Sequence, residues 1–149
     1  MILREHLGPF DTWGDWRGQL TQLEATCLPG EAWDEAQWQQ FSLNSLKTAT
    51  AWMGQKLVGF LVWQPLGPGE AEVIKVGVDP QTRRVGVAKM LLNHLEQSTA
   101  PNGRVLLEVR ANNTEANGLY QTQGYQKIGV RKSYYRHPVD DALLFEKQT

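Results

Sequence analysis

The segment from Val76 to Lys89 carries the pattern with the clearest chemical meaning in this sequence. It reads as the end of a β-strand, a short basic loop and the start of a helix. The first N–H groups of a helix have no partner within it, and the helix dipole favours an anion there. Small residues leave room for a phosphate and basic residues add charge: Gly86 and Ala88, then Arg83, Arg84 and Lys89. Two interpretations fit, a phosphate-binding loop or a glycine turn whose basic side chains are solvated.

Two further side chains are able to move protons. Glu108 is a polar position on an expected strand whose alternate residues, Val105, Leu107 and Val109, are apolar, and a carboxylate can accept a proton from an amine. Tyr120 falls on the next expected helix, and a phenol with a pKa of about 10 is protonated at neutral pH. From the residues alone, Glu108 also fits a solvated strand position, and Tyr120 also fits a core aromatic.

Cysteine and histidine do not indicate a second kind of site. The single cysteine, Cys27, excludes an intrachain disulfide, and no base is recognisable beside it, so a packing role is expected. The three histidines, His6, His94 and His137, lack metal-ligand spacing, so no metal is expected.

Composition limits the remaining classes. The length of 149 residues fits one domain over 1–149, and 41% hydrophobic with 21% charged residues is typical of a globular chain. The net charge of -1 weighs against nucleic-acid binding. The sequence shows no apolar run of bilayer length and no leader pattern, so a cytoplasmic protein without membrane contact is expected.

The elements that must position these residues read as a mixed α/β sheet of about seven strands with about four helices. After a short N-terminal strand, Trp13, Trp16 and Cys27 belong to one apolar helical stripe, and Asp34 with Gln37 predicts the capped start of a second helix. Further strands are expected at 46–53, 56–64, 71–78, 104–110, 125–130 and 142–146, and further helices at 86–97 and 113–122.

The basic loop resembles a known motif. Val78-Asp79-Pro80 followed by Arg83-x-x-Gly86-x-Ala88 is similar to the pyrophosphate-binding motif of the GNAT acyltransferases. The run from Leu107 to Asn113, with Tyr120 and Gly124-Tyr125 after it, resembles the bacterial ribosomal-protein-alanine N-acetyltransferases and related protein N-terminal acetyltransferases. The resemblance implies the GNAT fold, acetyl-CoA as co-substrate and direct transfer of the acetyl group in a ternary complex.

The resemblance also implies roles for individual residues. Glu108 matches the proton acceptor of that group, and Tyr120 matches the donor to the departing thiolate. The strand that ends at Val78 matches the family segment that contacts the pantetheine arm of CoA. The loop after it matches the segment that holds the CoA diphosphate, and Asn113, at the start of a later helix, matches another cofactor contact. These cofactor-binding positions are Val76, Gly77 and Val78, then Arg83, Arg84, Val85, Gly86, Val87, Ala88 and Lys89, and finally Asn113. Asn113 is equally suited to be an ordinary helix N-cap.

The acceptor implied by the resemblance is the N-terminal α-amino group of a protein, with the N-terminal alanine of a ribosomal protein as the expected case. Trp33, Tyr134 and Tyr135 match positions that contact the acceptor, and the two tyrosines are expected in a turn between the last two strands. Lys75-Val76-Gly77 replaces the more usual Asn-Ile-Ala, and Gly30-Glu31-Ala32 are extra residues. The alternatives are a GNAT enzyme that acetylates a lysine or a small amine, and a CoA-binding module without turnover.

Overall fold

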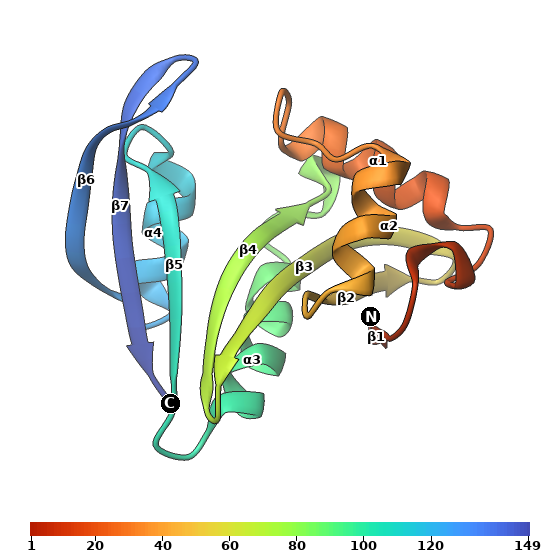
Figure 1. Cartoon of the computed structure of the whole chain (residues 1–149), viewed down its shortest axis with the longest axis horizontal. Coiled ribbons are helices and arrows are strands. Elements are labelled where there is room, and N and C mark those ends of the chain that lie inside the picture. The colour runs from red at the N-terminus through yellow and green to blue at the C-terminus, as the bar shows by residue number, and fades with distance from the viewer. The chain divides into compact units, whose positions relative to one another are not determined.

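The computed structural model describes residues 1–149 and contains seven β-strands, four α-helices and two short 3-10 helices (Figure 1). In chain order the elements are β1 (Ile2–His6), η1 (Phe10–Thr12), α1 (Arg17–Cys27), α2 (Glu35–Leu43), β2 (Lys47–Met53), β3 (Lys56–Gly67), β4 (Glu70–Val78), η2 (Pro80–Thr82), α3 (Val87–Thr99), β5 (Arg104–Arg110), α4 (Thr114–Thr122), β6 (Gln126–Arg136) and β7 (Val139–Gln148). No helix is both long enough and apolar enough to cross a membrane.

The strands form one mixed sheet in the order β1-β2-β3-β4-β5-β7-β6. The pairs β1–β2 and β2–β3 are antiparallel, and β7 lies antiparallel between β5 and β6. The parallel ladder between β4 and β5 is short, since it joins Glu70–Val73 to Arg104–Leu107 and ends there. Seven strands in a mixed sheet with four helices confirm the predicted fold class.

The chain divides into two compact units. The first comprises residues 1–65 and 74–95, and the second comprises residues 66–73 and 96–149. Strands β3 and β4 and helix α3 contribute residues to both units. The expectation of one domain over the whole chain stays a prediction.

An aromatic core fills the first unit. Phe10, Trp38 and Trp52 are buried, and the ring of Phe10 stacks on that of Trp38 with 5.6 Å between centroids. Trp16 meets Trp52 edge to face at 5.2 Å. Large rigid rings bury much apolar area for little conformational entropy, so this cluster holds the segments before and after α1 to the sheet.

The start of α2 confirms the capping prediction. The Asp34 side chain accepts a hydrogen bond from the Gln37 backbone N–H (2.7 Å), and the Gln37 side chain accepts one from the Asp34 N–H (3.0 Å). Trp33, just before the cap, packs edge to face on Trp38, one turn into the helix, at 4.9 Å. The reciprocal bonds satisfy two amides that the helix itself leaves unpaired.

Helix α3 lies close against β3 because Gly59 has no side chain. A Cβ at Gly59 would lie 2.6 Å from Cγ1 of Val87 and 3.2 Å from Cδ1 of Leu91, and both of these α3 side chains are buried. A larger residue at this point of β3 would push away the start of α3, which follows the basic loop.

In the second unit, β5 alternates as predicted and its bounds match the expected strand residue for residue. Val105, Leu107 and Val109 are buried, and Leu107 pairs with Phe145 of β7. The ring of Tyr120, on α4, lies 6.2 Å from that of Phe145. Helix α4 therefore covers the apolar face of β5 and β7, and Glu108 points to the opposite face because side chains alternate along a strand.

The first predicted helix starts later than its apolar stripe indicates. Helix α1 begins at Arg17, so Trp13 precedes it and Trp16 is its N-cap. Gly14 has a φ of +125°, a backbone conformation that residues other than glycine rarely adopt. This glycine interrupts the helical path between the two tryptophans.

The final hairpin also differs from the prediction, and Tyr134 and Tyr135 lie in a different element than expected. They are strand residues near the end of β6, which continues to Arg136, and not residues of a turn. The pairing register with β7 shifts between Arg131 and Tyr135, where Ser133 has a φ of +52° and its N–H donates to Asp141 Oδ1 (2.7 Å). This bulge lets the ladder resume after a polar stretch that resembles a turn in sequence.

Candidate active site

The loop between β4 and α3 is built around Asp79. Its side chain accepts a hydrogen bond from the Gln81 N–H (2.9 Å) and pairs with Lys56 Nζ (3.2 Å), and its own N–H donates to Val58 O (2.8 Å). The Gln81 N–H, and to a lesser degree Lys56, holds the pKa of the Asp79 carboxyl below its ordinary value. The Asp-Pro pair thus fixes where the loop begins.

Beyond this anchor the chain passes twice through the left-handed region. Arg84 has a φ of +69° and Gly86 a φ of +89°. A Cβ added at Gly86 would meet nothing within 4 Å, so the space beside it is open. The Gly86 carbonyl accepts a hydrogen bond from the Met90 N–H (3.0 Å), which closes the first turn of α3.

The amides at the start of α3 are donors that the helix does not use. They belong to Val87, Ala88 and Lys89, whose N–H groups lie before the first i to i-4 bond. The side chain of Val87 is buried, so only its backbone can face a ligand, whereas Arg84 and Lys89 are exposed. The left-handed Gly86 and the exposed basic side chains fit a glycine turn with solvated cations. The unpaired amides beside those cations also fit a phosphate-binding loop, so both sequence interpretations remain compatible with this geometry.

The predicted pantetheine strand is tightly packed at its end. The carbonyl of Val78 accepts hydrogen bonds from Cys27 Sγ (3.4 Å) and Arg83 Nε (3.3 Å). A Cβ at Gly77 would lie 2.5 Å from Cε1 of Phe60 and 3.0 Å from Cβ of Cys27. The glycine that departs from the family pattern therefore makes room for Phe60, and the Val78 carbonyl is already bonded within the chain.

Cys27 has the packing role that the sequence favours. It lies against the aromatic core of the first unit, and burial raises the pKa of its thiol despite the opposing charge of Arg83. A thiol that stays protonated and donates to a carbonyl is a poor nucleophile.

Glu108 faces a cation in the second unit. Its Oε1 lies 3.5 Å from Nη2 of Arg131, and 22% of the Glu108 side chain is exposed. The residue is thus ionisable and partly accessible on the face of β5 that α4 does not cover.

Tyr120 occupies a very different environment on the other face. Its side chain is buried and contacts the rings of Tyr125 (5.8 Å) and Phe145 (6.2 Å). Burial, with a smaller contribution from Tyr135, raises the pKa of the Tyr120 hydroxyl. The phenol therefore keeps its proton at neutral pH, and the two proton-moving candidates approach β5 from opposite faces.

Asn113 is the N-cap of α4. Its side chain accepts a hydrogen bond from the Ala116 N–H (3.1 Å). The capping function leaves the amide nitrogen of the side chain as the group that a ligand would meet.

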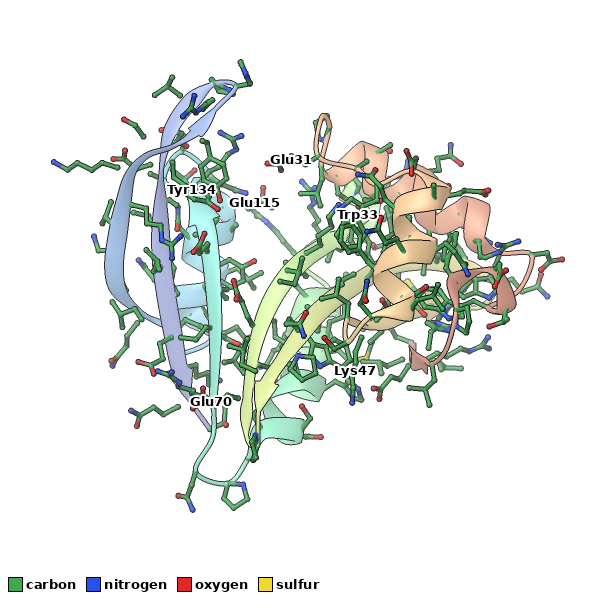
Figure 2. The ribbon with its side chains drawn as sticks, viewed as in Figure 1. Glu31, Trp33, Lys47, Glu70, Glu115 and Tyr134 are labelled. Carbon is green, nitrogen blue, oxygen red and sulfur yellow. The ribbon has the colours of Figure 1, made fainter.

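The three residues expected to contact the acceptor are all held by cations. The ring centre of Trp33, beside α2, lies 3.8 Å from Lys75 Nζ (Figure 2). The guanidinium carbon of Arg110 lies 4.0 Å from the ring centre of Tyr135, and that of Arg131 lies 5.5 Å from the ring centre of Tyr134. These contacts orient the aromatic side chains from one side of each ring.

The model of the acetyltransferase (GNAT) family matches residues 15–125 of this chain. The chain belongs to the GNAT family. This confirms the family resemblance on which the sequence analysis relies.

Curated relatives of this GNAT chain carry N-acetyltransferase names. N-alpha-acetyltransferase RimI of Mycobacterium tuberculosis is 38% identical over 99 residues, which are 64% of this chain and 62% of the relative. The [ribosomal protein bS18]-alanine N-acetyltransferase of Escherichia coli is 29% identical over 128 residues, or 78% and 86% of the two chains. The chain spans less than two thirds of the length of several curated relatives, the mycobacterial protein among them.

A solved structure shows the same fold. The ribosomal-protein-S18-alanine N-acetyltransferase from Escherichia coli superposes with a TM-score of 0.76 at 22% identity, over 97% of this chain and 92% of that one. At this identity the likeness concerns the fold alone.

The sequence did not predict one buried network of this GNAT chain. Glu24 on α1 is fully buried, and its Oε1 accepts hydrogen bonds from the Trp33 N–H (3.0 Å) and from Trp38 Nε1 (2.9 Å). Its Oε2 pairs with Lys75 Nζ, which also donates to Glu31 O (2.7 Å). Burial lowers the pKa of Lys75, and the Glu24 carboxylate opposes that shift. The network ties the extra residues between α1 and α2 to β4.

The one sequence feature that could have predicted this network is Lys75, which replaces the usual asparagine of the family. A lysine within a strand that otherwise reads as buried requires a buried anion, but nothing local in the sequence identifies Glu24 as that anion. Glu72 and Arg131 interact with Glu108, and the sequence assigned neither of them to the site, although Arg131 belongs to the C-terminal segment that resembles the family.

Proposed function

We propose that this chain transfers the acetyl group of acetyl-CoA to the N-terminal α-amino group of a protein, with the N-terminal alanine of a ribosomal protein as the favoured acceptor. The observation that carries the proposal is the turn before α3, where Gly86 is open and three helix amides lack intrahelical partners. Membership of the GNAT family and relatives named for α-amine and bS18-alanine acetylation support it.

The co-substrate is held by the first unit in this proposal. The amides of Val87, Ala88 and Lys89, with the charges of Arg83 and Arg84, bind the diphosphate of acetyl-CoA, and Val85 and Gly86 shape the turn around it. The backbone of Val76, Gly77 and Val78 contacts the pantetheine arm, and one of its N–H groups stabilises the oxyanion. Asn113 is a further proposed contact. No metal takes part.

Proton transfer falls to Glu108 and Tyr120. The α-amine has an unperturbed pKa of about 7.7–8.0, so Glu108 accepts its proton, directly or through a water, as the nitrogen bonds to the acetyl carbon. The carbon–sulfur bond then breaks, and Tyr120 gives its hydroxyl proton to the sulfur. Burial keeps the Tyr120 phenol protonated at neutral pH, so a proton is present for the departing sulfur, and the phenolate left behind takes a proton back from water before the next turnover.

In this proposal Tyr134 and Tyr135 cover the acceptor, and Trp33 is a further acceptor contact. Tyrosine combines apolar area with a hydroxyl that can bond a peptide carbonyl. A lysine acceptor, with a pKa of about 10.4, demands more of the base than an α-amine does. The rivals are therefore acetylation of a lysine or a small amine, and CoA binding without turnover.

A peptide panel with mass spectrometry tests the proposal. Peptides with a free N-terminal Ala, Ser or Thr are expected to gain one acetyl group at the α-amine. The same peptides blocked at the N-terminus but carrying an internal lysine are the matched controls, and they are expected to be poor acceptors. Acetyl groups found mainly on internal lysines would overturn the acceptor class, and the absence of acetylation with every acceptor would favour the binding module.

A further inference from the structure

Glu108 shares one face of the second unit with two charged residues from other strands. In the parallel ladder Glu72 of β4 pairs with Leu106 of β5, and Glu108 lies on the same face as Leu106 because side chains alternate. Arg131 of β6 reaches this face as well, with Nη2 3.5 Å from Glu108 Oε1. Three strands therefore bring two carboxylates and one guanidinium together.

The two neighbours act on Glu108 with opposite signs. Burial and the charge of Glu108 raise the pKa of Glu72, whereas Arg131 lowers it. The two carboxylates therefore repel one another, and the guanidinium of Arg131 attracts both. The side chain of Arg131 is 55% exposed, so water weakens its effect but does not remove it.

Other charged groups on this face have partners of their own. Arg110, two residues further along β5, donates to Pro138 O (3.1 Å) and lies over the ring of Tyr135. On β7, Glu146 pairs with Arg104 (3.2 Å), which also reaches Glu70 (3.4 Å). Helix α4 covers the opposite face. Glu72 and Arg131 are thus the two charged side chains that we place against Glu108.

We propose that Arg131 and Glu72 are positioning residues of the acetyl-transfer reaction, which act through Glu108 with opposite effects on its capacity to accept a proton. The inference rests on the proposed function, because it takes Glu108 as the base. Arg131 holds the Glu108 carboxylate ionised and oriented, and Glu72 offsets that cation so that Glu108 remains basic enough to take the proton of the amine.

The same guanidinium also reaches the proposed acceptor contact. Arg131 lies over the ring of Tyr134, 5.5 Å from its centre, and its Nη2 pairs with Glu108. One side chain therefore touches both the residue expected to cover the peptide and the residue expected to take the proton. Loss of Arg131 is accordingly expected to alter kcat more than the KM for acetyl-CoA.

The test measures kcat/KM for the acetylated peptide against pH in the full chain, for wild type, Arg131→Gln, Arg131→Lys and Glu72→Gln. The amine titrates identically with every variant, so the ratio of variant to wild type isolates the enzyme's own group. Removal of the cation should move the acid limb toward higher pH by no more than about half a pH unit, because the ion pair is partly exposed, and removal of the second carboxylate should move it the opposite way. Arg131→Lys keeps the charge and should restore most of the profile.

Matched controls remove the same charges nearby. Lys132→Gln removes a cation from the β6 position next to Arg131, and Glu70→Gln removes an anion from β4 two residues before Glu72. For each control, the ratio of its kcat/KM to that of wild type should be independent of pH. Flat ratios for Arg131→Gln and Glu72→Gln, with folded proteins by circular dichroism, would overturn the inference while leaving the proposed function intact.

A second readout does not depend on the acceptor. In carboxyl-carbon NMR titrations, the midpoint of Glu108 relative to wild type should rise in Arg131→Gln and fall in Glu72→Gln. Unchanged midpoints would reject the coupling. If no acceptor in the panel is acetylated, the proposed function fails, and this titration still decides whether the three charges are coupled.

Discussion

At the scale of single residues, Glu108 and Tyr120, the proposed base and acid, lie in contrasting environments. The carboxylate is partly accessible and faces a guanidinium, so it is available as an acceptor. The phenol is buried among aromatic rings and its pKa is raised, so it is protonated at neutral pH. Their residue types suggested these roles, but only the structure places them on opposite faces of β5.

Removal of either group should slow the chemical step. Glu108→Gln keeps the shape and removes the basicity, and Tyr120→Phe removes only the hydroxyl. Each is expected to lower kcat by about 10²-fold or more, the usual scale for general acid–base groups, with little change in the KM for acetyl-CoA. Steady-state rates with saturating peptide provide the measurement.

Tyr125→Phe is the matched control for the hydroxyl. Tyr125 is also buried on the same unit, but its hydroxyl donates to Glu96 Oε2 (2.9 Å). Its loss should reduce stability by about 1–3 kcal/mol, because a buried carboxylate loses a donor, and should leave kcat close to wild type. Equal losses of kcat in both tyrosine variants would remove Tyr120 from the mechanism.

At the scale of elements, local signals predicted the structure well where one segment decides its own conformation. The capping box of Asp34 and Gln37 and the alternation of buried and partly exposed residues over 104–110 each depend on residues close in sequence, and both predictions were correct. The bulge at Ser133 depends on an Asp141 side chain contributed by the partner strand. A polar stretch cannot reveal such a distant hydrogen bond, so β6 was predicted too short.

Among the polar contacts between α1 and β4, the Glu24–Lys75 pair should be the one whose loss lowers the free energy of unfolding most. Both side chains are almost inaccessible, at 0% and 8% exposure. Lys75→Met leaves a buried carboxylate without its cation and should cost about 3–5 kcal/mol of unfolding free energy, whereas the double variant Glu24→Gln with Lys75→Met should recover part of it. Urea unfolding with unchanged m-values checks this.

Lys56→Met provides the comparison for that lysine. Lys56 pairs with Asp79 at 3.2 Å but is 55% exposed, so its loss should cost no more than about 1 kcal/mol. A similar cost for the two lysine variants would mean that burial of the Glu24–Lys75 pair does not control its energy.

At the scale of the whole molecule, each unit combines interactions that are local in sequence with interactions between residues far apart in the chain. The loop from Asp79 to Lys89 is continuous, so its residue types alone indicated a tight glycine turn before a helix, either as a phosphate-binding loop or with solvated basic side chains. Glu24 and Lys75 are separated by 51 positions, and Glu108 and Arg131 by the whole of α4. Long-range partners follow from strand order and register, which no single segment encodes.

The placement of the aromatic residues allows the single-domain prediction and co-substrate binding to be tested together. All six tryptophans lie in the first unit and all four tyrosines in the second. If 1–149 is one domain, tryptophan fluorescence and tyrosine near-ultraviolet signals should melt in one coincident transition. Acetyl-CoA binds the folded state only, so at about a hundred times its Kd it should add about 2.7 kcal/mol and raise both melting curves together by several degrees.

Gly86→Glu should abolish that rise, since it puts bulk and negative charge where the diphosphate is proposed to lie. Gly54→Glu is its matched control, because Gly54 also has a positive φ (+61°) and open space around it, so it carries the same backbone strain without touching the loop. The control should melt at a similarly reduced temperature but keep its response to acetyl-CoA. A full response in Gly86→Glu would separate the turn before α3 from co-substrate binding, and a rise confined to the tryptophan signal would mean that the two units unfold independently.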